Sequence, residues 1–429
     1  MSKLSLINVN SFKFVVIIPA AGSSERMRSS SFSLSSSSLS NQNGPLNKNP
    51  VFRRQQVLPK QYQIACSKPL IYHTVSSFLR LKWIDYIIVL ASPELLKKMD
   101  ELLSSLAKQQ QKRFECIAGG TTRHRTIKIG LEHIEQKKLQ PDYIIVHDGA
   151  RPLIDERNLQ ELLTECYQHG AAGFCCDLTS TIISVHKDTS TLNEVLDRSK
   201  YLASETPQAF RSNLILDAYR KCTDDDLDYN TECLDLVKRY TKFDAKLLPV
   251  DPNLYFKVTY RKDLFAADNI LKEHRNILLH CDFDCDKPFI NYKFIKQLKD
   301  DLVANFADVK YFSDSVKIKN LVQHSPGTVH VLLHYCEHWN IVLEQNLAAY
   351  EHLVYIVVNS DKDNVELTNG ASSSLLKWSK SVISKEIKNF YLIFTHAKNL
   401  DQESLRIRNI VVYLSKELPV EVSGQTFFI

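Results

Sequence analysis

The 429-residue sequence lacks the patterns that mark metal-binding, membrane or nucleic-acid-binding proteins. It has no CxxC pair, so reduced thiols in the cytosol are favoured over disulfides or zinc for its ten cysteines. A net charge of +5 without a long basic run does not call for a nucleic acid. The longest apolar stretch near the start, Phe14 to Ala21, is far shorter than the roughly 20 residues of a membrane helix and lacks a signal-peptide cleavage site. We therefore expect no membrane segment.

The length of the chain predicts two domains, because one hydrophobic core rarely keeps growing to this size. In residues 12–274, short runs rich in Val and Ile alternate with segments of helical period, which predicts an α/β domain with a mostly parallel sheet, a Rossmann-like arrangement. The expected strands are Val15–Pro19, Tyr86–Ala91, Phe114–Ala118, Tyr143–His147 and Gly173–Leu178. The expected helices are Pro69–Leu81, Pro93–Lys108, Thr122–Glu135 and Glu156–Gln168. Ligands of such sheets bind beyond the carboxyl ends of the strands.

Two segments interrupt this alternation. Residues 29–58 are dominated by Ser, Asn, Gln, Gly and Pro, which predicts a disordered insertion, because such a segment buries too little apolar surface to offset the entropy of ordering. In residues 180–198, two stretches containing Ile and Val flank a polar turn at Lys187–Thr191, which predicts a hairpin that projects from the sheet. A projecting arm of this kind often reaches a second subunit.

The alternation restarts in residues 275–429, which predicts a second, smaller α/β domain of Rossmann-like type. Its expected strands are Ile277–Phe283, Val329–His334, Leu353–Val358 and Phe390–Phe394, with helices ending near Phe306, around Leu375–Ser384 and around Ser404–Leu418. Of the 11 glycines in the chain, only Gly327, Gly370 and Gly424 lie there, and none follows the first strand. The glycine-rich turn that lets a backbone approach a pyrophosphate is therefore missing, and the ligand of this domain stays open.

Small residues follow the first expected strand, namely Ala20, Ala21 and Gly22, and Arg26 comes shortly after them. Small residues at this place let main-chain amides turn inward as a nest for phosphate oxygens, and Arg26 adds a cation. An ordinary tight turn with a surface arginine is the alternative. Lys60 follows a proline and can point its ammonium at a triphosphate, although a solvated lysine is equally open.

Two later segments also carry candidate site residues. Gly119 and Gly120 permit close approach to a flat base whose edge Thr126 can hydrogen-bond; a plain loop with a helix cap is the alternative. Asp148, at the end of a buried strand, can meet Mg²⁺ or a ribose, and Arg151 can bind a substrate phosphate. The alternative for Asp148 and Arg151 is a structural ion pair.

Seven motifs follow one another in unbroken order over residues 14–273. They are Pro19-Ala20-Ala21-Gly22 with Arg26-Met27, Pro59-Lys60-Gln61, Gly119-Gly120, His147-Asp148 with Ala150-Arg151-Pro152, Asp197-Arg198, Thr206-Pro207-Gln208, and Lys257-Val258-Thr259. In this set the chain resembles the methylerythritol-phosphate cytidylyltransferase family. The second domain and the sequence of residues 257–264 resemble the animal branch of that family, which acts on ribitol 5-phosphate.

The resemblance implies specific roles, in a reaction that uses CTP and Mg²⁺. The positions that match CTP-binding residues of the family are Ala20, Ala21, Gly22, Gly120, Thr126 and Gly149. The positions that match catalytic residues are Arg26, Lys60, Lys257 and Asp148, with Asp148 near the metal. The positions that match substrate-binding residues are Arg151, Thr181, Arg198 and Thr206. The resemblance also implies a homodimer in which the arm of one subunit presents Arg198 to the other.

The activity that the resemblance favours is transfer of CMP from CTP to D-ribitol 5-phosphate, giving pyrophosphate and CDP-ribitol for protein O-mannosyl glycans of the dystroglycan type. The runner-up acceptor is 2-C-methyl-D-erythritol 4-phosphate. The alternative from a different functional class is a catalytically silent binding scaffold. The chain departs from the family pattern at Ser24, where a glycine is usual, and at Thr121, where an acid is usual. These departures concern the contacts to the base more than catalysis.

Overall fold

The computed structural model describes residues 6–22, 58–109, 113–186, 188–230, 232–282, 292–306, 308–312, 328–336, 352–359, 389–396, 400–418, 423 and 426–428. The chain divides into two compact units, Met1–Asp268 and Asn269–Ile429. This division falls within helix α10 (Arg261–Glu273), a few residues before the boundary expected after residue 274. Arg26, nearly all of the serine-rich insertion and the helix expected around Leu375–Ser384 lie outside the described residues.

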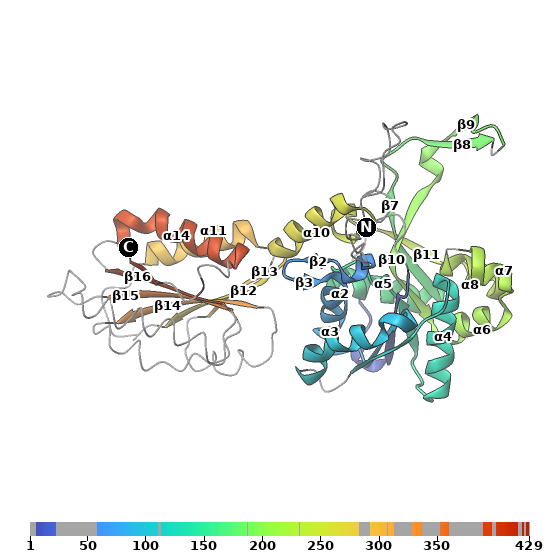
Figure 1. Cartoon of the computed structure of the whole chain (residues 1–429), viewed down its shortest axis with the longest axis horizontal. Coiled ribbons are helices and arrows are strands. Elements are labelled where there is room, and N and C mark those ends of the chain that lie inside the picture. Colours follow the sequence, from blue (N-terminus) through green and yellow to red (C-terminus); the bar gives the residue numbers. More distant parts are fainter. Residues whose placement is uncertain are drawn as a thin grey trace, which may run out of the picture. The chain divides into compact units, whose positions relative to one another are not determined.

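A seven-stranded sheet forms the centre of the first unit, with strand order β11-β7-β10-β6-β1-β4-β5 (Figure 1). Its strands are β1 (Phe14–Ala20), β4 (Tyr86–Ala91), β5 (Phe114–Ala118), β6 (Tyr143–Val146), β7 (Ala171–Asp177), β10 (Leu202–Arg211) and β11 (Lys246–Pro249). Only β10 runs antiparallel to its neighbours in this sheet. The fold is therefore α/β with a mostly parallel sheet, as expected.

Helices cover both faces of this sheet because successive side chains of a strand point to opposite faces. In β1, Val16 and Ile18 pack with α2 (Leu70–Leu79), α3 (Leu96–Gln109) and α5 (Glu156–His169). Val15 and Ile17 pack with the helices of the other face, which are α4 (Arg123–Gln136), α6 (Ser212–Lys221) and α8 (Cys233–Thr241). Strands buried on both faces appear as continuous apolar runs, which is why the sequence located β1, β4, β6 and β7.

The sequence reading missed β10, β11 and the helices α6, α7 (Asp224–Tyr229) and α8. β10 contains the polar and proline-containing stretch Ser204–Gln208, which is atypical of a central strand. It lies between β6 and β7 all the same, and its register with β7 shifts between Glu205 and Gln208. The irregularity accommodates Pro207, which has no amide proton for a regular ladder.

The expected arm is a two-stranded hairpin of β8 (Ile182–His186) and β9 (Thr191–Leu196). Figure 1 shows it projecting beyond β7 and β10. Four of its apolar side chains are at least half exposed, for example Ile183 at 53 % and Val195 at 60 %. Two strands with an uncovered apolar face are marginally stable in water.

The second unit contains a parallel six-stranded sheet of order β13-β12-β14-β15-β16-β17. Its strands are β12 (Asn276–Asp282), β13 (Asp308–Phe312), β14 (Val329–Cys336), β15 (His352–Asn359), β16 (Asn389–His396) and β17 (Thr426–Phe428). Helices α11 (Tyr292–Asn305) and α14 (Leu400–Glu417) pack on one face (Figure 1). The expected second α/β fold with a Rossmann-like sheet is therefore confirmed, although β13 and β17 were not predicted.

The described residues also bear on the expectations about cysteines, metal sites and membrane helices. Seven cysteines are free thiols, namely Cys66, Cys116, Cys166, Cys175, Cys176, Cys222 and Cys233. Nowhere in the described ranges do three or more His, Cys, Asp or Glu side chains gather as a metal site. No helix within them has the length and apolar character needed to cross a bilayer.

Candidate active site

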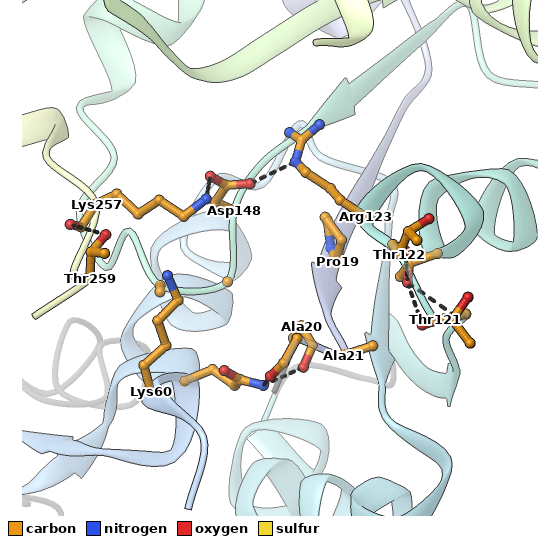
Figure 2. Close-up of a pocket in the computed structure, with 16 residues that line it drawn as sticks. Pro19, Ala20, Ala21, Lys60, Thr121, Thr122, Arg123, Asp148, Lys257 and Thr259 are labelled. Carbon is orange, nitrogen blue, oxygen red and sulfur yellow. Dashed lines mark hydrogen bonds and ion pairs between the residues drawn. The ribbon is translucent and has the colours of Figure 1, made fainter. Parts of the chain in front are cut away.

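A pocket of about 340 Å³ lies beyond the carboxyl ends of β1, β5 and β6. It is lined by Pro19, Ala20, Ala21, Gly22, Lys60, Gln61, Gly120, Thr121, Thr122, Arg123, Thr126, Asp148, Gly149, Ala150, Lys257 and Thr259 (Figure 2). These residues come from five separate segments of the first unit. The edge is where ligands of parallel sheets bind, because the loops that follow neighbouring strands converge there.

Asp148 is the centre of charge in this pocket. Its carboxylate oxygens lie 2.8 Å from Lys257 Nζ, 3.2 Å from Arg123 Nε and 3.4 Å from Arg151 Nε. Burial by itself raises the pKa of a carboxyl group, but here the cations of Arg123, Lys257 and Arg151 outweigh it and hold the pKa of Asp148 well below its ordinary value. Asp148 is therefore an anion with little tendency to take a proton.

Lys60 and Lys257 place two ammonium groups around the same cavity. Lys60 begins a short 3-10 helix, η2 (Lys60–Tyr62), whose N-cap is Pro59. Figure 2 shows the Lys60 side chain directed into the pocket that also receives Lys257. Lys257 comes from the far end of the first unit, just before α10. The pocket thus has the cations that a triphosphate requires.

Gln61 holds the loop that follows β1. Its side chain is 4 % exposed, and Nε2 donates to the carbonyl oxygens of Ala20 at 2.6 Å and Gly22 at 3.1 Å. These two bonds hold the loop that lines the pocket in place. The sequence reading quoted Gln61 in a motif without giving it a role.

The paired glycines allow two loops to come close to each other. A Cβ at Gly119 would lie 2.9 Å from Ala21 Cβ and 2.9 Å from Thr126 Cγ2, and one at Gly120 would lie 2.8 Å from Arg125 Cβ. Thr126 Oγ1 accepts from the Gly120 amide at 3.1 Å. The glycines therefore pack the β5–α4 loop against the loop after β1, and Thr122 is the N-cap of α4, bonded to the Arg125 amide.

Thr206 and His147 form a buried hydrogen-bond network with the main chain at Asp148. Burial lowers the pKa of His147 to about 4, so its ring is neutral. Nε2 lies 2.9 Å from the Arg151 carbonyl oxygen, which can only accept, so Nε2 carries the proton. Nδ1 therefore accepts from Thr206 Oγ1 at 3.1 Å, and Oγ1 in turn accepts from the Asp148 amide at 3.2 Å.

We expect Thr206→Val to lower the free energy of unfolding of the first unit by about 1–3 kcal/mol, because it leaves a buried amide and a buried ring nitrogen without partners. Thr206→Ser keeps the hydroxyl and is the matched control. Urea titration followed by circular dichroism measures the difference. Equal stability of the valine and serine variants would contradict the network.

The acceptor-side candidates are not brought together in this single chain. Arg151 is buried and does not line the pocket; it pairs with Asp148 and Glu205 and donates to the Tyr255 carbonyl oxygen. Arg198 is exposed on the arm side, where Nη1 donates to the Thr179 carbonyl oxygen at 2.8 Å. Thr181 is also exposed, and Thr206 is occupied by His147 and Asp148.

Arg123 is the pocket cation that the sequence reading overlooked. It lies in the Gly119–Thr126 segment, in which only the two glycines and Thr126 were given a role, in binding the base. It opens α4, and its guanidinium reaches Asp148 across the pocket. An arginine in the first turn of a helix that follows a glycine-rich loop was the available signal.

Asp148 can contribute one carboxylate to a divalent cation. Magnesium in nucleotide sites is typically held by one or two carboxylates together with substrate phosphates. A single ionised carboxylate beside lysines fits that pattern, whereas a cage made only of protein ligands does not. The residues present are therefore compatible with a metal that arrives with a nucleotide.

Comparison with known proteins gives three findings. The family model of 2-C-methyl-D-erythritol 4-phosphate cytidylyltransferase matches residues 52–273, just over half of the chain. A D-ribitol-5-phosphate cytidylyltransferase of Xenopus tropicalis is 40 % identical over 227 residues, covering 52 % of this chain and 54 % of that protein. Its Homo sapiens counterpart is 37 % identical over 251 residues, covering 57 % and 54 %. The chain thus spans about half the length of these curated relatives.

Among solved structures, 4-diphosphocytidyl-2C-methyl-D-erythritol synthase of Anaerococcus prevotii aligns with a TM-score of 0.45 at 19 % identity. The alignment covers 62 % of this chain and 98 % of that one.

Proposed function

Because the chain belongs to the 2-C-methyl-D-erythritol 4-phosphate cytidylyltransferase family, we propose that it transfers CMP from CTP to D-ribitol 5-phosphate and releases CDP-ribitol and pyrophosphate. The observation that carries the proposal is the pocket in which Lys60, Lys257 and Asp148 face a loop of small residues. The choice of ribitol phosphate is supported by the names of the relatives at 37–40 % identity.

The pocket residues divide between the base and the phosphates of CTP. The cytosine and ribose lie against the loops that contain Ala20, Ala21 and Gly22, and against Gly120, Thr126 and Gly149. Lys60 and Lys257 bind the triphosphate, and the family motif assigns the same role to Arg26, which lies outside the described residues. Asp148 would hold a divalent cation together with the phosphates, and that cation would screen their charge.

The transfer needs charge stabilisation and positioning rather than a covalent intermediate. A phosphate oxygen of the acceptor attacks the α-phosphorus in line, and pyrophosphate leaves. The acceptor phosphate has its second pKa near 6 and is already ionised at neutral pH, so no general base is required. Lys60 and Lys257 stabilise the negative charge that develops at the α-phosphoryl oxygens.

The acceptor site is completed by a second copy of the chain. Arg198 and Thr181 lie on or beside the arm and do not line the pocket of their own subunit. The half-exposed apolar residues of the arm, such as Ile183 and Val195, call for a partner surface. In a homodimer, Arg198 reaches the acceptor phosphate of the neighbour, and Arg151 and Thr206 contribute from beneath. The free thiols fit a reducing compartment, the cytosol.

The direct test offers Mg²⁺-CTP with ribitol 5-phosphate or methylerythritol phosphate and follows pyrophosphate release. We expect a kcat/KM for ribitol 5-phosphate at least about tenfold higher than for methylerythritol phosphate, since buried hydrogen-bonding sites discriminate strongly between polyols. A preference for methylerythritol phosphate would move the assignment to the runner-up. If no pyrophosphate is released with either acceptor, the catalytically silent scaffold is favoured.

A further inference from the structure

A chain of buried polar side chains leads away from Asp148 on the side opposite Lys257. Arg123 Nε contacts Asp148 Oδ1 at 3.2 Å, and Arg123 Nη1 donates to Cys233 Sγ at 3.2 Å. The Tyr219 hydroxyl lies 3.4 Å from Cys233 Sγ and 2.7 Å from His124 Nδ1. Only Arg123 among these four side chains behind Asp148 lines the pocket.

Three helices supply this chain of contacts. Arg123 and His124 open α4, Tyr219 lies in α6, and Cys233 is the first residue of α8. The start of α8 is tied to the sheet, because Gln208 Nε2 of β10 donates to Glu232 Oε1 at 2.7 Å. The thiol of Cys233 therefore has a fixed position relative to the strands that carry the pocket.

The polar chain has an energetic cost. Tyr219, His124 and Cys233 are all almost completely buried. His124 Nε2 has no hydrogen-bond partner within the described part of the chain. An apolar cluster of the same shape avoids this desolvation penalty. A functional role of Arg123, which is the end of this row of polar side chains that reaches the pocket, accounts for the desolvation cost.

Arg123 and Lys257 hold Asp148 from two sides. Lys257 contacts Oδ2 and Arg123 contacts Oδ1, so each carboxylate oxygen faces a different cation (Figure 2). A guanidinium is planar and donates in fixed directions, so two bonds, to Asp148 and to Cys233, determine its orientation. With only the Asp148 contact, the guanidinium loses one of the two bonds that set its orientation and can turn away from Oδ1, while Lys257 and Arg151 still contact Oδ2.

We propose that Arg123 is a positioning residue for nucleotidyl transfer, acting through Asp148, and that Cys233 is the group that holds Arg123 in place. This inference rests on the proposed function, in which Asp148 serves the metal-bound nucleotide. Cys233 affects the reaction only by way of Arg123. The two residues therefore form a coupled pair, and a double-mutant cycle detects the coupling.

The experiment compares the wild-type chain with Cys233→Ala, Arg123→Gln and the double variant. Two quantities are measured: kcat/KM for pyrophosphate release, and the affinity for Mn²⁺-CTP by calorimetry without acceptor. We expect Cys233→Ala to lower kcat/KM by about tenfold in the wild-type background and by less than about twofold in the Arg123→Gln background. Nucleotide affinity should show the same non-additivity.

Two further variants separate positioning from packing. Cys233→Ser retains an acceptor for the guanidinium, and it should recover most of the loss caused by alanine. Cys166→Ala is the matched control, because Cys166 is also buried, its thiol donates to the Gly170 carbonyl oxygen, and it does not line the pocket. It should lower the melting temperature without lowering kcat/KM.

Additive losses in both quantities, or a serine variant no better than alanine, would overturn the proposal. The nucleotide-affinity cycle also distinguishes this outcome from failure of the proposed function. A chain that releases no pyrophosphate with any acceptor contradicts the assigned activity, whereas coupling between Cys233 and Arg123 in Mn²⁺-CTP affinity still supports the positioning pair.

Discussion

Lys257→Ala should reduce kcat by at least about 100-fold, because removal of one preorganised charge donor at the reacting phosphate typically has an effect of this size. The same loss is expected for Lys60→Ala. Neither change should unfold the first unit, since Arg123 and Arg151 remain beside Asp148 when Lys257 is removed. Steady-state pyrophosphate release measures kcat.

Lys262→Ala is the control for Lys257→Ala. Lys262 lies five residues further along, exposed on α10 and outside the pocket, and its removal changes the net charge by the same amount. We expect its kcat to remain within about twofold of wild type, as for surface substitutions away from the site. Turnover near the wild-type value in either Lys60→Ala or Lys257→Ala would refute the assignment of that lysine.

Mixing two inactive chains should restore activity if the site is shared between subunits. Arg198→Ala removes the arginine that the arm presents, and Lys60→Ala removes a lysine from the pocket. In a heterodimer of the two variants, one site then carries both defects and the other carries neither. Random exchange in a symmetric dimer makes about a quarter of all sites intact, so the mixture should recover about a quarter of wild-type activity.

If Arg198 serves its own subunit, every site keeps one defect and mixing restores nothing. Subunit exchange is verified separately with differently tagged chains, so that absence of recovery is decisive. In the isolated chain, the Arg198 guanidinium bonds the Thr179 carbonyl oxygen on the arm side, and Arg198 does not line the pocket of its own subunit.

Much of the fold was accessible from local patterns. β1, β4 and β6 are buried on both faces and therefore appear as continuous apolar runs. β10 was not accessible, because its polar and proline-containing sequence becomes a central strand only through pairing with β6 and β7. Long-range pairing of this kind leaves no periodicity within the strand itself.

The site shows the same division. The sequence by itself determined that a loop of small residues follows β1, that Lys60 and Lys257 come later in the order of the family motifs, and that an acid, Asp148, follows β6. These are local motifs, and the carboxyl edge of a parallel sheet gathers them whatever the details of packing.

Only the tertiary structure decided which groups surround Asp148. It turned Arg151 into the core to pair with Glu205, engaged Thr206 with His147, and placed Arg123 between Asp148 and the thiol of Cys233. Each of these contacts joins segments from different strands and helices. A side chain's partner depends on how those elements pack, because a direction in space is set by the whole fold and not by the residues next to it in the sequence.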